Sequence, residues 1–119
     1  MMPLPPHRRQ PGLPEGQAGF TLGLAPESPV FLGHFPGDPV LPGVIQVDWA
    51  IRFGEACFGP LGAFMGLEQL KFLEPVRPGP GLALALALDR SGPGPRLRFS
   101  YQVDSGRKSS GTILFTHFL

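Results

Sequence analysis

The spacing of proline and glycine sets the strongest limit on how this chain can fold. It holds 17 glycines and 16 prolines among 119 residues. Proline removes an amide donor and clashes inside a helix, so a long helix needs a stretch without proline. Residues 43–58 run sixteen residues without proline, between Pro42 and the pair Gly59-Pro60. We therefore expect the one long helix here.

Apolar residues lie on almost every side of the expected helix, which predicts that it is buried. Its charged residues are confined to one side. At about 100° per residue, Asp48, Arg52 and Glu55 fall within about 60° of one another, with Gln46 on roughly the opposite side. A charge pair on so apolar a helix would have to be desolvated, which is costly for a purely structural pair.

The other periodic segments indicate strands. The segment LALALAL, residues 82–88, consists of good helix formers, but it alternates with period two and is bounded by Pro-Gly pairs, so we predict a strand. One strand, a helix and four further strands predict an α+β domain with one helix packed on an antiparallel sheet. The expected strands are residues 20–24, 67–76, 82–88, 97–103 and 112–118.

Composition favours one folded domain with a tail. Leu, Ile, Val and Phe make up roughly 30 % of the chain, above the level of disordered chains, and the length fits one domain. Residues 1–18 are rich in Pro, Arg, Gln and Gly and show no hydrophobic period. We therefore expect a flexible N-terminal tail over residues 1–18 and a domain over residues 19–119.

Composition also excludes several classes of function. Ten basic and nine acidic residues give a net charge of +1, too balanced for a nucleic-acid binder. The single cysteine, Cys57, cannot form an internal disulfide or a cysteine cage for a metal, and it fits a cytoplasmic protein. The longest apolar run has seven residues, whereas a membrane span needs about 20. The first residues lack the apolar core of a secretory signal.

The segment GHFPGDPVLPG, residues 33–43, carries the candidate chemistry. Its three glycines and three prolines dictate the backbone path around His34. Gly43 opens the expected helix, so its N–H is a free donor for a carbonyl oxygen that gains negative charge. Asp48 lies about 7.5 Å further along the helix. The residues alone leave two interpretations open: an acid–base site, or an ordinary hydrogen-bonded His34 with Asp48 paired to Arg52.

The segment HFPGDPVLPGVIQVDWA, residues 34–50, closely resembles the active-site segment of the 3-hydroxyacyl-acyl-carrier-protein dehydratases of fatty-acid synthesis. These are hotdog folds, in which an antiparallel sheet wraps one long buried helix. Their motif has the same His, Gly and Pro-Gly pair, followed at a fixed spacing by a catalytic Glu or Asp. LKFLEPVRPGPGLALALAL is similar to the family's third and fourth strands, so the resemblance spans about residues 20–118. The DWA ending and the small size are most similar to the branch associated with aryl-polyene and other specialised acyl chains.

The resemblance implies a lyase that dehydrates (3R)-3-hydroxyacyl thioesters to trans-2-enoyl thioesters, with neither a metal nor a nicotinamide cofactor. His34 would remove the C2 proton and the Gly43 N–H would hold the thioester carbonyl. Asp48 would hydrogen-bond the 3-hydroxyl and help it leave as water. The implied oxyanion and substrate-binding residues are Gly43, Val44, Phe35, Leu41 and Arg52.

The resemblance also implies partners. An acidic acyl carrier protein or coenzyme A would carry the acyl thioester. Two copies of the chain would form a homodimer with shared active sites, the His of one subunit facing the acid of the other. The arginines that could meet the carrier, and that solvated strand faces explain equally well, are Arg77, Arg90, Arg96 and Arg98.

Two positions depart from the family pattern. The dehydratases usually carry Gln where this chain has Arg52, and Met where it has Leu41. A cation one turn after Asp48 favours the ionised carboxylate, which cannot donate a proton. Either Arg52 is drawn away to Glu55, or Asp48 orients the hydroxyl while His34 handles the proton.

Two alternatives within the same fold stay open. One is a catalytically silent subunit that binds acyl chains or partners an active paralogue, which Arg52 and the small size would suit. The other is a thioesterase, against which the HFPG loop argues. A nucleophile–base pair of Cys57 and His117 has no supporting spacing, and Cys57 is expected to be a core thiol. Three scattered histidines predict no metal site.

Overall fold

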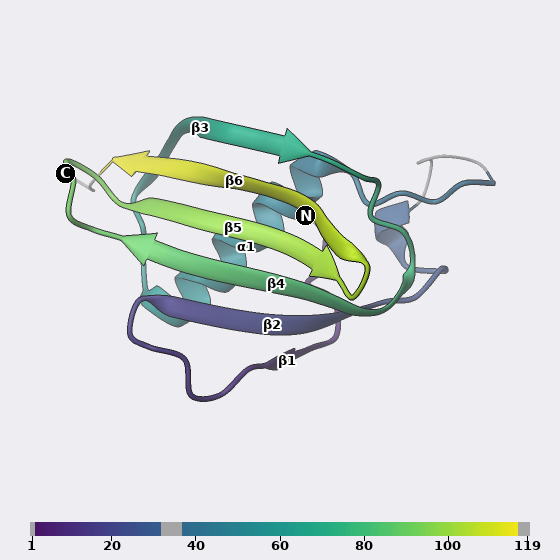
Figure 1. Ribbon diagram of the computed structural model, residues 1–119. Coiled ribbons are helices and arrows are strands. Elements are labelled where there is room, and N and C mark those ends of the chain that lie inside the picture. Colours follow the sequence, from purple (N-terminus) through teal and green to yellow (C-terminus); the bar gives the residue numbers. More distant parts are fainter. Residues whose placement is uncertain (1, 32–36, 117–119) are drawn as a thin grey trace.

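The computed structural model describes residues 2–31 and 37–116. One six-stranded antiparallel sheet is crossed on one face by a single long helix, as the sequence predicted (Figure 1). The strands lie in the order β1-β2-β4-β5-β6-β3. The elements are β1 (His7–Arg9), β2 (Gln17–Leu24), the 3-10 helix η1 (Pro29–Phe31), α1 (Gly43–Phe58), β3 (Ala63–Phe72), β4 (Gly79–Asp89), β5 (Arg96–Val103) and β6 (Gly106–Thr116).

Helix α1 has the bounds that proline and glycine predict, but the expectation that it is buried on every side is corrected. Its buried residues recur at the three- and four-residue spacing of one helix face, because only the sheet covers it. On the uncovered side Val44 is 76 % exposed. The buried face consists of Gln46, Trp49, Ala50, Phe53 and Gly54.

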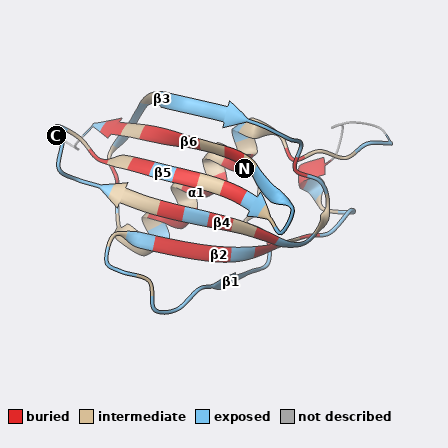
Figure 2. Ribbon diagram, viewed as in Figure 1, coloured by how far each residue is buried: buried red, intermediate tan, exposed pale blue. Residues whose placement is uncertain are grey.

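The alternating segment of β4 is a strand, which confirms the prediction for LALALAL. Leu84 and Leu86 are buried and lie opposite Tyr101 and Phe99 of β5, while Ala85 between them is exposed (Figure 2). Burying one leucine contributes about 1.5–3 kcal/mol, whereas helix propensities of ordinary residues differ by less than about 1 kcal/mol. Packing against the helix therefore decides the structure of this segment.

The N-terminal segment differs from the expected flexible tail over residues 1–18. His7–Arg9 form strand β1 beside β2, and β2 itself begins at Gln17. The His7 ring stands edge-on to the ring of Phe53, with centroids 4.8 Å apart, and Met2 and Leu4 pack against the core. Met2, Leu4 and His7 each stand next to a proline and follow no hydrophobic period, so the sequence does not predict these contacts.

Strand β3 forms an uncovered edge of the sheet. It pairs with β6 on one side, and within the described residues no strand pairs with its other side. Figure 2 shows the strand in the colour of exposed residues over most of its length. Large apolar side chains exposed on this strand and just beyond it are Phe64, Met65, Leu67, Leu70, Phe72 and Leu73.

The far end of α1 is tied down by two polar contacts. Arg90 donates to the carbonyl of Phe58 at 3.1 Å, and the Glu55 carboxylate accepts the N–H of Leu61 at 3.2 Å.

Across the part of the chain that is described, no helix has the length and apolar character needed to cross a membrane.

Candidate active site

The first turn of α1 presents backbone donors. Pro42 occupies the N-cap position and provides no side-chain cap. The N–H groups of Ile45 and Gln46 donate to the Pro42 carbonyl at 3.1 Å, whereas among the described residues nothing accepts the N–H of Gly43 or Val44. Two amides at the positive end of a helix dipole are thus available to an oxygen that gains negative charge.

Glycine at position 43 answers a packing requirement. A Cβ atom there would lie 2.5 Å from Cζ of Phe72, which stands at the end of β3. The ring of Phe72 therefore packs directly over the backbone of Gly43.

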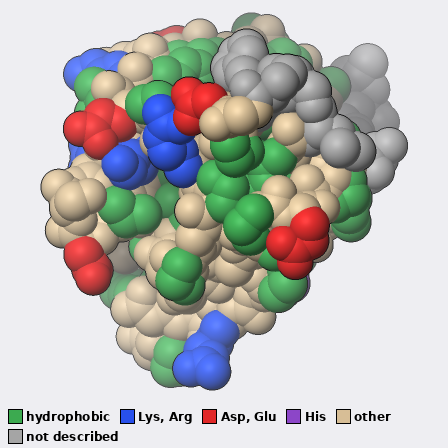
Figure 3. All heavy atoms as spheres, turned by 90° about the vertical axis from the view of Figure 1, so that its right-hand side faces the viewer, with side chains coloured by type: hydrophobic (Ala, Val, Ile, Leu, Met, Phe, Trp, Pro, Cys, Tyr) green, Lys and Arg blue, Asp and Glu red, His purple; other side chains and the backbone are tan. Residues whose placement is uncertain are grey.

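A mainly apolar hollow of about 380 Å³ opens beside Gly43. Its volume is within the range of small-molecule sites. Figure 3 looks at the end of the molecule where α1 begins, and hydrophobic side chains gather there between charged ones. The residues lining the hollow are Val40, Leu41, Pro42, Gly43, Gln46, Phe72, Leu73, Glu74, Pro75 and Val76. Leu41 and Gly43 line this hollow, and their predicted substrate-binding roles remain predictions. The sequence did not identify Phe72.

Asp48 and Arg52 lie on the uncovered side of α1. Their side chains are 42 % and 26 % exposed, so the expectation of a desolvated pair is corrected for the single chain. Arg52 Nη1 is 3.4 Å from Asp48 Oδ2 but only 2.6 Å from the carbonyl oxygen of Met2, to which it donates. Arg52 is therefore drawn toward the N-terminal segment, while Glu55 accepts the N–H of Leu61 and does not hold Arg52.

The opposite side of α1 carries a buried hydrogen-bond network. Gln46 Nε2 donates to the Leu41 carbonyl at 3.0 Å, and its Oε1 accepts from the Ser109 hydroxyl at 2.6 Å. The Tyr101 hydroxyl donates to the Gln46 carbonyl at 2.7 Å. Burial raises the pKa of Tyr101 well above its usual value, and the charge of Asp48 raises it further, so this donor keeps its proton. Only Gln46, a polar residue between apolar ones, hinted at the network in the sequence.

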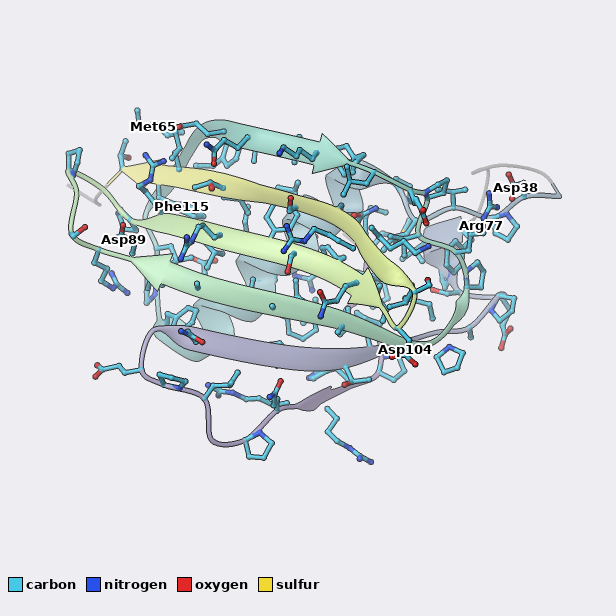
Figure 4. The ribbon with its side chains drawn as sticks, in the orientation of Figure 1. Asp38, Met65, Arg77, Asp89, Asp104 and Phe115 are labelled. Carbon is cyan, nitrogen blue, oxygen red and sulfur yellow. The ribbon has the colours of Figure 1, made fainter. Side chains whose placement is uncertain are left out.

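His34 and Phe35 lie outside the described residues, so their predicted roles remain predictions. The described residues continue from Gly37, and Asp38 forms an ion pair with Arg77 at the end of the molecule where α1 begins (Figure 4). This pair ties the segment that precedes α1 to the segment that follows β3.

The other candidate residues that the structure describes lie in surroundings that indicate no catalytic role. Arg96 pairs with Glu68 at 3.2 Å, and Arg98 is exposed. Burial raises the pKa of the Cys57 thiol, which is half-buried, and His117 lies outside the described residues. Within residues 2–31 and 37–116 no three metal-ligating side chains cluster.

The order of the strands and the single helix laid across them define this protein as a hotdog fold. The chain belongs to the ApeI-like family, because the family model described as ApeI dehydratase matches residues 10–112.

Two solved structures are similar over nearly their full length. A chain of the dehydratase heterocomplex ApeI:P from Xenorhabdus doucetiae matches with a TM-score of 0.82 and 33 % identity, covering 92 % of this chain and 96 % of its own. An uncharacterized protein from Erwinia carotovora subsp. atroseptica matches with a TM-score of 0.74 and 30 % identity, covering 92 % and 94 %.

Curated relatives are 3-hydroxyacyl-[acyl-carrier-protein] dehydratases named FabZ. That of Thermomicrobium roseum is 33 % identical over 91 residues, which is 71 % of this chain and 51 % of the relative. That of Novosphingobium aromaticivorans is 34 % identical over 91 residues, 62 % and 58 % respectively. The chain spans about half the length of the curated relatives it matches.

Proposed function

We propose that this protein dehydrates (3R)-3-hydroxyacyl thioesters to trans-2-enoyl thioesters during fatty-acid or polyene-type acyl chain synthesis. The observation that carries the proposal is the uncapped start of α1, where the Gly43 N–H borders an apolar hollow. Asp48 follows five residues later on the uncovered side of the helix. Membership of the ApeI-like dehydratase family supports this chemistry.

The chemistry divides between three groups. His34 takes the C2 proton, and the electrons of that C–H bond form the C2–C3 double bond while the C3–O bond breaks. The Gly43 N–H stabilises the negative charge that develops on the thioester oxygen. Asp48 orients the 3-hydroxyl, and the proton that His34 took from C2 passes to this oxygen, so that it leaves as water. Leu41 and Val44 would wall the acyl chain beside Phe35, and Arg52 would lie beside Asp48 in the substrate-binding part of the site.

A second copy of the chain would complete the active site. The uncovered edge of β3 and its exposed apolar side chains suit strand pairing between two copies. Val44 and the side chain of Asp48 lie on the side of α1 that the sheet leaves bare. In a homodimer the His34 of the partner subunit would face Asp48 across this surface.

The acyl group would be carried by an acyl carrier protein or coenzyme A, and the protein would act in the cytoplasm. The relatives, which are dehydratases named for an acyl-carrier-protein substrate, support the first statement. The single cysteine, which favours a reducing compartment, supports the second.

A second candidate function is a partner subunit that lacks turnover of its own. One observation favours it: the similar structure from Xenorhabdus doucetiae is a dehydratase heterocomplex rather than a single chain type. In that case the β3 edge would meet a different hotdog chain.

Hydration of crotonyl thioester by the full chain tests these functions. We expect turnover by the wild type and a loss of about 10²–10⁴-fold in His34→Ala, since a general base contributes that much. Asp48→Asn keeps the shape of the side chain and should also lose turnover. Equal rates for wild type and His34→Ala would exclude the enzyme and favour the partner subunit. Release of free thiol from acyl-coenzyme A would indicate a thioesterase instead.

A further inference from the structure

The buried network around Gln46 is not used by the proposed acid–base chemistry. Gln46 is 3 % exposed, and Ser109 and Tyr101 are fully buried. Every polar atom that these three side chains place in the network has a partner at 2.6–3.0 Å. A satisfied network in a buried place fixes one arrangement of the elements that it joins, and these elements are α1, β5 and β6.

The network reaches the residue that leads into the helix. The carbonyl of Leu41 accepts from Gln46, and the N–H of Leu41 donates to the Val76 carbonyl at 2.8 Å. Val76 also lines the hollow, as does Glu74. Lys108, next to Ser109 on β6, holds Glu74, because its Nζ bonds the Glu74 carboxylate at 2.8 Å and its carbonyl accepts the Glu74 N–H at 3.2 Å. Two adjacent residues of β6 thus bond residues that line the hollow: Ser109 bonds Gln46, and Lys108 bonds Glu74.

The usual device for fixing a helix start is missing here. A capping side chain would settle the first turn, but Pro42 cannot act as one. The hydrogen bond from the Gln46 side chain to the Leu41 carbonyl spans this first turn instead, and Gly43 lies between the two residues in the sequence. The Gln46 side chain, and the strand hydroxyl that orients it, therefore brace the turn that contains Gly43.

We propose that Gln46, oriented by Ser109 and Tyr101, is a positioning residue that aims the Gly43 N–H into the hollow. The proposal rests on the proposed function in taking that N–H as the donor to the thioester oxygen. Charge on this oxygen develops in the transition state, so a misdirected donor lowers kcat and leaves KM nearly unchanged. A displacement near 1 Å costs about 10²-fold in rate.

Variants of Ser109 test the proposal most directly. Ser109→Ala removes the hydroxyl that orients Gln46, and we expect kcat for crotonyl thioester to fall by about 10–10²-fold. Ser109→Thr restores a hydroxyl on a strand that tolerates branching, and should recover most of the rate. Ile113→Val, also buried on β6, is the matched control for a packing change without polar atoms, and it should keep the wild-type kcat below its melting temperature.

A second measurement does not depend on turnover. The amide resonance of Gly43 in a ¹H–¹⁵N spectrum should shift in Ser109→Ala and stay in place in Ile113→Val. If the resonance shifts but the wild type shows no turnover, the proposed function fails and the positioning of the amide stands. If the resonance and kcat both stay at wild-type values, or if Ile113→Val changes kcat as much as Ser109→Ala, the positioning role is overturned.

Discussion

At the scale of single residues, Gly43 and Phe72 act on one another. The ring of Phe72 occupies the space that any side chain at position 43 would need. Phe72 is 51 % exposed, so its ring can turn aside. A substitution at Gly43 should therefore leave the fold intact and disturb the hollow.

We predict that Gly43→Ala has a melting temperature equal to or slightly above that of the wild type, because Ala loses less backbone entropy than Gly in a helix. Its turnover of crotonyl thioester should fall at least about tenfold, since the new methyl group would push the Phe72 ring over the N–H at position 43. Adding Phe72→Ala should restore part of the rate. A double variant no faster than Gly43→Ala would show that the ring is not the cause.

The Arg52 guanidinium donates to the carbonyl of Met2 and to the carboxylate of Asp48, and the Met2 carbonyl is the nearer acceptor. We predict that Arg52→Gln keeps or raises the rate of hydration, because Gln removes a cation beside Asp48 and can still donate to the carbonyl. The comparison is kcat of the two purified proteins at one pH. A collapse of kcat in Arg52→Gln would assign Arg52 an essential part in turnover.

At the scale of elements, the closeness of α1 to β5 depends on a second glycine. A Cβ atom at Gly54 would lie 2.8 Å from Cδ2 of Leu97, a side chain that is fully buried. Unlike Phe72, Leu97 has no free space to turn into.

We predict that Gly54→Ala lowers the free energy of unfolding by about 1–3 kcal/mol, because overpacking outweighs the better helix propensity of Ala. Urea denaturation followed by circular dichroism measures this change. Gly92→Ala is the control, since a Cβ atom there meets nothing within 4 Å and should change stability by less than about 0.5 kcal/mol. Equal stability of the two variants would contradict the proposed tight contact.

How much the sequence predicts differs from element to element. The helix bounds followed from Pro42 and Gly59-Pro60, and β4 followed from its period of two. Strand β3 begins at Ala63 rather than at residue 67, because its exposed side chains follow no alternation. Strand β1 has three residues and no period at all. The segment that resembles the dehydratase motif identified Gly43 and Asp48. Ser109 and Tyr101, however, lie 63 and 55 residues from Gln46 along the chain, so the sequence could not show that they contact it.

At the scale of the whole molecule, the two ends are organised differently. The Asp38–Arg77 pair and the hollow lie at the end where α1 begins, and Met65 and Phe115 lie at the other end (Figure 4). Along the top edge in Figure 1, β3 runs between the two ends with its outer side uncovered. Because the hollow lies beside Phe72 at the end of β3, association through β3 would place the hollow of each copy next to the other copy.

We predict that the wild type is a dimer by light scattering and that Phe64→Lys with Met65→Lys is a folded monomer without turnover. These side chains are 56 % and 65 % exposed, so charge there should not unfold the chain but should oppose burial between copies. Thr21→Lys, at an exposed position on β2, is the control and should remain dimeric. A wild type that is monomeric and fully active would contradict the shared site.

The opposite edge of the sheet has a different character. Strand β1 is three residues long, with Pro5 and Pro6 before it and Pro11 just after it, so it offers an incoming strand few amide donors. If the β3 edge accepts another strand and the β1 edge does not, each chain can pair with one other chain. No further chain can then add to the sheet. Addition of strands would stop at a pair, which protects the protein against growth into fibres.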